Sequence, residues 1–236
     1  MNAHSIRSVS ILTLTALCLW LAPLTASAAF TMTTSAAGVQ TSAVAGVTTE
    51  TFNGFPVSNS YSLISTLNYA LTGNPFAIVA ADQYGGAGGV GRYFSVGDPS
   101  TQPPMPASAT MTFVSPKTYL GLWLSAIDDG NKIEFFSGVT SVGLFDGNGL
   151  AASLSSTYSG VNGNLGEKAA YLNFTGITFD KLVISSRQGS GFEADNFSFG
   201  SAPGNAVPEP TTMTLGLIGT LMAGGIARFR RKTVVA

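Results

Sequence analysis

Seven short β-strand patterns in a row, each ended by a turn, leave this chain few ways to fold. Between residues 109 and 199, runs of apolar and β-branched residues alternate with Gly, Asn, Asp or Pro, which is typical of strands and their connections. The predicted strands cover residues 109–114, 119–127, 132–136, 141–145, 170–174, 177–185 and 192–199. No segment among them has the apolar spacing of a soluble helix. The sequence therefore predicts an all-β domain, an antiparallel, jelly-roll-like β-sandwich.

The predicted strand at residues 119–127 shows the clearest alternation of side chains. Leu120, Leu122 and Leu124 fall on one face, and Trp123 falls on the other. We expect the leucine face to pack against the core. A tryptophan in such a strand is also most often buried, so we expect Trp123 to be a core residue.

The chain before residue 109 has weaker strand patterns. Residues 30–51 are mostly Thr, Ser, Ala, Gly and Val, which bury little apolar area, so we expect a leading segment with one edge strand before Phe52. Residues 76–80 are a better strand candidate. Residues 99–106 contain four prolines and are predicted to form an extended loop, because Pro cannot donate to a central ladder.

A glycine-rich segment, residues 82–93, is the most unusual part of this region. It has five glycines in the seven positions 85–91, and Gly86 to Gly91 match the GxGxxG pattern of dinucleotide-binding proteins. That pattern binds a pyrophosphate only where a strand turns into a helix, whereas a predicted strand at residues 92–96 follows here. We therefore expect a surface loop whose backbone takes positive φ or lies close to a partner.

The last thirty residues, 207–236, carry a different pattern. A Pro-Glu-Pro motif is followed by seventeen uncharged residues, 211–227, and then by an arginine-rich tail. Seventeen apolar residues are the lower limit for a helix that crosses a membrane, and adjacent cations favour the cytoplasmic side. We expect one C-terminal transmembrane helix, with the preceding domain outside. The motif and tail positions are Val207, Pro208, Glu209, Pro210, Arg228, Arg230 and Arg231.

The order of these three parts resembles the PEP-CTERM sorting signal of exported proteins of Gram-negative bacteria. The resemblance implies that exosortase, an intramembrane cysteine protease, cuts near Glu209 and passes the product to the cell surface or the extracellular matrix. Glu209 and its flanking prolines would then be read by that enzyme and have no catalytic role in this chain. The alternative is an ordinary C-terminal anchor that is never cut.

The N-terminus has the pattern of a secretory signal peptide. Arg7 precedes an apolar run, residues 9–24, and the small residues Ala26, Ser27 and Ala28 offer a site for signal peptidase. Cleavage after residue 28 would also remove Cys18, the only cysteine in the chain. The exported form could then make no internal disulfide, so its stability must come from packing or from a bound metal.

Removing both terminal signals leaves residues 29–206, enough for one domain with its own core. This span has eleven acidic and six basic residues, a net charge of −5, and no basic cluster. Nucleic acid and anionic membrane surfaces are therefore excluded as partners, because both need a positive stripe. The only histidine is His4, in the signal peptide, which excludes a Ser-His-Asp triad and a zinc site of the usual kind.

Two acidic residues near the end of the domain are candidate metal ligands. Glu193 and Asp195 are two positions apart, so in a strand both point to one side and could share an ion. Carboxylate oxygens suit calcium, which is abundant outside cells. The alternative is that both are solvated acids at a strand end. No other cofactor is expected.

The glycine-rich segment is the candidate ligand surface. An exposed aromatic ring packs on the C–H face of a sugar, while neighbouring amide, carboxyl and guanidinium groups bond to its hydroxyls. The candidate residues are Asp82, Gln83, Tyr84, Arg92 and Tyr93. Residues 192–197, as a closing strand after residues 177–184, are similar to the end of exported jelly-roll, carbohydrate-binding-like domains. That resemblance implies at most a binding module.

Together these patterns predict a non-catalytic protein of the cell surface or extracellular matrix, structural or associated with extracellular polysaccharide. Its processing partners would be signal peptidase and exosortase, with a transient stay in the inner membrane. One alternative is a polysaccharide-active hydrolase that pairs Asp128 or Asp129 with Glu193, because glycosidases need only two well-placed carboxylates. The other is an adhesin that binds another protein.

The terminal signals make a direct prediction about the mass of the exported protein. Intact mass spectrometry of the surface form should show loss of residues 1–28 and of the segment after Pro210. A surface protein that still carries residues 228–236 would contradict exosortase sorting and favour the plain anchor.

Overall fold

The computed structural model describes residues 29–97, 107–159, 167–187 and 191–201. These residues all belong to one compact unit. The predicted signal peptide, the loop at residues 99–106, the sorting motif and the predicted transmembrane helix lie outside the described residues. Within the described ranges, no helix is both long enough and apolar enough to cross a membrane.

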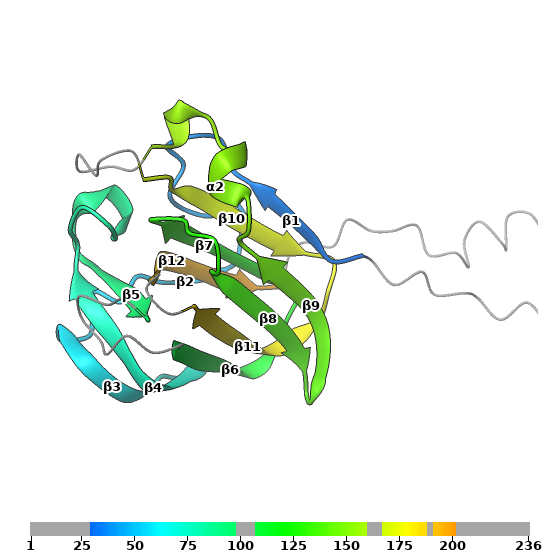
Figure 1. The fold of residues 1–236 in the computed structure, drawn as a ribbon. Helices are drawn as coiled ribbons and strands as arrows, with labels where there is room; N and C mark the ends of the chain where they lie inside the picture. The colour runs from blue at the N-terminus through cyan, green and yellow to red at the C-terminus, as the bar shows by residue number, and fades with distance from the viewer. Residues whose placement is uncertain (1–28, 98–106, 160–166, 188–190, 202–236) are drawn as a thin grey trace, which may run out of the picture. The chain divides into compact units, whose positions relative to one another are not determined.

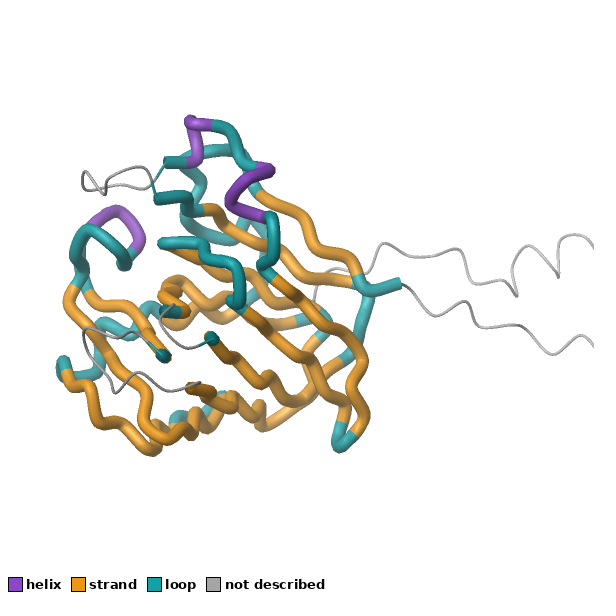
Figure 2. Tube along the Cα trace, viewed as in Figure 1, coloured by secondary structure: helices purple, strands orange, loops and turns teal. Residues whose placement is uncertain are grey.

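The described domain is almost entirely antiparallel β-structure (Figures 1 and 2). Its helical turns are short: Ala87–Gly89 (η1), Leu150–Ser153 (α2) and Ser156–Tyr158 (η2). The strands are Thr31–Thr34 (β1), Thr48–Glu50 (β2), Ser58–Ser65 (β3), Tyr69–Ala80 (β4), Arg92–Val96 (β5), Ala107–Lys117 (β6), Tyr119–Ser125 (β7), Lys132–Ser137 (β8), Thr140–Asp146 (β9), Ala170–Thr175 (β10), Phe179–Ser186 (β11) and Phe192–Gly200 (β12). The predicted all-β sandwich is confirmed, and each of the seven predicted strands overlaps a strand of the structure, β6 to β12.

The strands form one continuous sheet that folds over on itself to make two layers. Its order is β1-β10-β7-β12-β5-β4-β6-β11-β8-β9, with β2 paired to β12 and β3 paired to β4. Strand β4 connects the layers, because residues 69–73 pair with β6 whereas residues 77–80 pair with β5. Pro75, which has no backbone N–H, lies between the two paired parts. Figure 1 shows β10, β7, β12 and β5 side by side as one of these layers.

Aromatic side chains fill the space between the layers. Phe174 of β10 is the centre of one group, with ring centroids 5.2 Å from Phe135 of β8 and 5.4 Å from Phe145 of β9. Phe113 of β6 lies 5.0 Å from Phe199 of β12 in the same way. These contacts join strands of opposite layers, so the core holds the sandwich closed.

Strand β7 is buried along its whole length and separates two apolar groups. Leu120, Leu122 and Leu124 lie in the main core, as the alternation predicts. Trp123 is buried as expected, but it lies on the opposite face in a small cluster with Ala169 and Tyr171. The second face of this layer is therefore covered as well.

The N-terminal segment supplies part of that cover, which corrects the expectation for residues 30–51. The structure has two strands there, β1 and β2. Between them, the hydroxyls of Ser42 and Tyr119 are hydrogen-bonded at 2.8 Å, and Asn173 donates its side-chain N–H to the Ser35 hydroxyl at 3.0 Å. We expected these small side chains to bury little apolar area. The hydroxyls of Ser42 and Ser35 nevertheless hydrogen-bond to polar side chains of β7 and β10.

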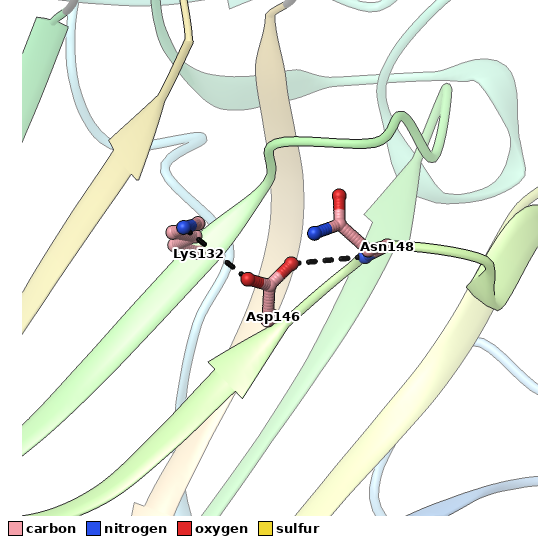
Figure 3. A network of polar contacts seen from close by, with 3 residues as sticks. All are labelled: Lys132, Asp146 and Asn148. Atoms are coloured by element: carbon pink, nitrogen blue, oxygen red, sulfur yellow. Dashed lines mark hydrogen bonds and ion pairs between the residues drawn. The ribbon is translucent and has the colours of Figure 1, made fainter.

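An exposed polar network lies at the open end of the β8–β9 hairpin, away from its turn (Figure 3). Lys132 and Asp146, directly opposite in the ladder, form an ion pair at 3.2 Å, and Asn148 donates its backbone N–H to Asp146 at 3.1 Å. The Asn148 N–H holds the pKa of Asp146 below its usual range, and Lys132 adds to the effect. Because the pair is exposed, we expect it to contribute little to stability.

The aromatic core makes a prediction about unfolding. Phe174→Ala leaves a cavity among the rings of Phe30, Phe135 and Phe145. It should lower the free energy of unfolding by about 3 to 5 kcal/mol, measured by urea denaturation of residues 29–206. Val139→Ala is the matched control, because Val139 is 93% exposed and loses almost no buried contact. Equal midpoints for the two variants would contradict this account of the core.

Candidate functional site

The outer face of the layer formed by β5, β12, β7 and β10 gathers side chains that could bind a ligand. In the ladders, Glu193 lies opposite Ser95 of β5 and Ser125 of β7, and Asp195 lies opposite Trp123. Directly opposite residues of an antiparallel pair point to the same face. The carboxylates, the serines and the indole therefore share one face, opposite the phenylalanine core.

These polar groups are buried. Asp195 is 3% exposed and Glu193 is 5% exposed, although carboxylates are almost never buried to this degree without partners. Ser95 is fully buried, and Ser125 donates its hydroxyl to the backbone carbonyl of Glu193 at 3.3 Å. Sequence reasoning expected Glu193 and Asp195 near a solvated strand end or an ion, and the structure places them inside the fold.

Backbone N–H groups hold the Asp195 carboxylate from two sides. Oδ2 accepts a hydrogen bond from Ala87 at 3.0 Å, and Oδ1 accepts one from Asn196 at 2.7 Å. Burial raises the pKa of Asp195 to about 6; the two N–H groups oppose this rise, and the charge of Glu50 adds to it. Asp195 thus fixes the glycine-rich loop to the sheet.

A β-bulge at Asn196 determines which side chains reach this face. Asn196 has a φ of 50°, and the β12–β7 register shifts between Asp195 and Ser198. The extra residue lets Phe192 and Phe197 both enter the core although they are five positions apart. Glu193 and Asp195 are left on the outer face.

The glycine-rich loop folds over this face for local reasons. Asp82 starts the turn, because its carboxylate accepts hydrogen bonds from the backbone N–H groups of Tyr84 at 2.8 Å and Gly85 at 3.0 Å. A Cβ on Gly85 would lie 2.3 Å from the ring of Tyr93, so only glycine fits there. The predicted positive φ is confirmed in this loop, at Gly86, Gly88, Gly89 and Gly91.

The loop does not have the geometry of a dinucleotide site. The residues after it form strand β5, as predicted, and the loop itself holds only the helical turn η1. A pyrophosphate site needs the N-terminus of a full helix at this point. Close packing against Tyr93 explains Gly85, and positive φ explains the other four glycines of the loop.

The five predicted ligand-binding residues have different environments in the structure. Asp82, Gln83 and Tyr84 are exposed, and Tyr84 keeps 43% of its surface. Tyr93, expected to offer an exposed ring, is 1% exposed and donates its hydroxyl to Asp82 at 3.3 Å. Arg92 is half-buried and donates from its guanidinium to the backbone carbonyls of Asn53 and Phe55. Only the first three lie at the surface.

The acids proposed for the hydrolase alternative take part in a turn between β7 and β8. Asp129 accepts the backbone N–H of Gly149 at 2.9 Å. Asn131, fully buried, accepts the backbone N–H of Asp128 at 2.8 Å and donates to the carbonyl of Gly191 at 2.7 Å. These contacts account for the Asp-Asp-Gly-Asn sequence as a connection within the fold.

The calcium hypothesis for Glu193 and Asp195 stays a prediction. In the described ranges, no group of three or more His, Cys, Asp or Glu side chains is placed to hold a metal. Calcium takes six to eight oxygen ligands, and both Asp195 oxygens already accept backbone N–H groups. A bound ion would need the hydroxyls of Ser95 and Ser125, or water, to complete its ligands.

Sequence reasoning missed Ser95, Ser125 and Ala87 as neighbours of the carboxylates. The alternation of residues 119–127 places Ser125 on the same face as Trp123, which is a usable signal. The register that brings Ser95 opposite Glu193, and the contact from Ala87, join segments about one hundred residues apart. No local pattern contains that information.

Comparison with known proteins identifies the C-terminal signal. The chain carries a PEP-CTERM protein-sorting motif at residues 206–232. No curated protein sequence matches the chain. Among solved structures, the X-ray structure of GH31 CBM32-2 bound to GalNAc aligns with 74% of this chain and 99% of that chain, at 13% identity and a TM-score of 0.23. The motif confirms the resemblance found in the sequence.

The buried Asp195 makes a prediction about pH. Its pKa of about 6 in the folded state lies above its ordinary value of 3.8, so between these values the folded protein keeps a proton that the unfolded chain has released. Stability should therefore fall as pH rises through this window, by about 2 kcal/mol between pH 4.5 and 7.

Urea unfolding at several pH values, with a chelator present, checks this prediction. In the variant Asp195→Asn, the side chain at this position cannot titrate, so the variant should lose this part of the pH dependence of its free energy of unfolding. Its stability relative to the wild type should therefore increase as pH rises. Taking the difference between the two proteins removes the contribution of every other acid. Parallel curves for wild type and variant would contradict a raised pKa at Asp195.

Proposed function

We propose that this chain is an exported, non-catalytic protein of the cell surface or extracellular matrix, sorted by exosortase and associated with glycans. The observation that carries the proposal is the PEP-CTERM motif at residues 206–232, which implies export and processing by exosortase. The domain before it is a β-sandwich, a fold that presents loops and sheet faces to large ligands.

The environment of the acids favours binding over hydrolysis. A glycosidase needs one carboxylate free to protonate the leaving group and a second free to attack or to activate water. Asp195 is instead held by two backbone N–H groups, and Asp129 accepts a backbone N–H in a turn. Residues 29–206 also contain no histidine or cysteine that could serve as a base or nucleophile.

The exposed part of the glycine-rich loop supports glycan association. Tyr84 offers a half-exposed ring, and Asp82 and Gln83 beside it can bond to sugar hydroxyls. An aromatic face next to short polar side chains is the usual way in which proteins hold a pyranose ring. The domain is acidic, so we expect neutral sugars to be preferred over uronic acids.

One observation favours assembly with other protein chains as a second candidate function. Among the described strands, β3 pairs only with β4, so no described strand covers its other edge, and Leu63 on it is 57% exposed. No charged residue occurs between Glu50 and Asp82, although charges on edge strands normally prevent pairing with another chain. Register irregularities in the β3–β4 ladder limit how long such pairing could be.

Incubation with the extracellular polysaccharide of the producing strain tests the proposed function. We expect the domain to be retained on the polymer, to release no reducing ends, and to lose retention in Tyr84→Ala because the stacking ring is gone. Leu67→Ala is the matched control, since Leu67 is 94% exposed in the β3–β4 turn. Reducing ends that disappear in Glu193→Gln would show a hydrolase, and a domain that neither binds nor cuts would leave assembly as the surviving function.

A further inference from the structure

We propose that the outer face of β5, β12 and β7 is a sugar-binding site that the glycine-rich loop closes. The site takes one neutral or amino-sugar residue between Trp123, Ser95 and the two carboxylates of β12. It rests on the proposed function in one respect, namely that the ligand is a glycan. It is separate from the exposed surface at Tyr84 and has its own test.

Unpartnered polar atoms are the first reason for a ligand site here. The indole N–H of Trp123 and the hydroxyl of Ser95 are buried, and neither has a hydrogen-bond partner in the described part of the chain. Native proteins leave few buried polar groups in this state, and each one calls for an explanation. Both groups lie on the face that carries Glu193 and Asp195.

The chemistry of the neighbouring groups matches a sugar. A carboxylate accepts hydrogen bonds from hydroxyl donors, an indole N–H donates one, and a serine hydroxyl does both. The rings of Trp123 and Tyr171, in one buried cluster, are apolar surfaces on which the C–H side of a pyranose can pack. Two carboxylates on one face disfavour an anionic ligand, so a uronic acid or a phosphate should not bind.

Ala87 at present makes the contacts that such a ligand would make. Its methyl group packs against the cluster of Trp123, Ala169 and Tyr171, and its N–H bonds to Asp195 at 3.0 Å. A sugar could replace both, with a C–H face on the ring and a hydroxyl on the carboxylate. In the free protein, Ala87 would then occupy and block a site that is otherwise complementary to a sugar.

The loop is built so that only its tip needs to move. Its base is held by hydrogen bonds from Ala81 N–H to Gly91 at 3.0 Å and from Asp82 N–H to Gly85 at 3.1 Å. At the tip, Gly86 and Gly88 flank Ala87 with φ of 95° and 69°, and glycine changes such angles at little steric cost. Val90 at the far side of the tip is 72% exposed and is not tied down by burial.

The intrinsic fluorescence of the exported protein reports directly on this site. The chain has two tryptophans, Trp20 and Trp123, and removal of the signal peptide leaves Trp123 alone. The exported protein would be titrated with D-glucose, D-galactose, D-glucosamine and oligosaccharides from partial hydrolysis of the producer's polysaccharide. D-glucuronate is the anionic comparison. At least one neutral or amino sugar should change the Trp123 emission saturably, and glucuronate should not.

Two variants separate a ligand site from a structural polar face. Ser95→Ala removes a hydroxyl that has no described partner, so the fold should keep its stability while sugar affinity falls about three- to tenfold. Ala87→Gly removes the blocking methyl group and should tighten binding. Val90→Ala, in the same loop but exposed, should leave the affinity unchanged.

The possible outcomes distinguish this site from the surface at Tyr84. An emission change that persists in Tyr84→Ala, with retention on the polymer lost, supports two separate sites. Retention without any change in Trp123 emission leaves the proposed function intact and overturns the closed site. The closed site is also overturned if Ser95→Ala binds the sugar as tightly as the wild type.

Discussion

The pairing of β12 with its neighbours is the constraint on which the rest of this structure depends. Strand β12 is hydrogen-bonded to β7 along one edge. Along its other edge, residues 192–194 pair with β5 and residues 197–199 pair with β2. Both of its faces are buried, one by the phenylalanines of the core and the other beneath the glycine-rich loop and the N-terminal segment. Because the second face carries carboxylates, its covering segments must supply hydrogen-bond donors. Ala87 of the loop donates its backbone N–H to Asp195, and Asn196 of β12 itself supplies the second N–H. The bond from Ala87 fixes where the loop lies.

Most of the architecture could be predicted from local patterns, and the arrangement of the candidate site could not. Alternation in β7 and turn residues between strands are enough to indicate a sandwich, since they record which face each side chain occupies. The bulge at Asn196 breaks that rule, so simple alternation would place Phe192 and Phe197 on opposite faces, whereas both lie in the core. Tyr93 was expected at the surface because the sequence around it does not show that Gly85 packs against its ring.

The export of this domain and the packing of its core are linked, because residues 29–206 contain no cysteine that could form a disulfide. An exported domain that keeps no cysteine has no disulfide to hold it, so it depends on its core and its hydrogen bonds. The aromatic contacts between layers supply the first, and the hydroxyl network of Ser42, Tyr119 and Asn173 helps to supply the second. In such a fold, a loop whose tip is held to the sheet by the bond from Ala87 to Asp195 is a place where the structure can open without unfolding.

Amide hydrogen exchange at Ala87 tests this account most directly. We expect the Ala87 N–H to be protected in the free protein, because it is bonded to a buried carboxylate. A bound sugar should release this amide to fast exchange, while the amide of Leu122 in the core of β7 keeps its protection. Fast exchange of Ala87 in the free protein would contradict closure of the loop, and protection that a saturating sugar leaves unchanged would contradict its opening.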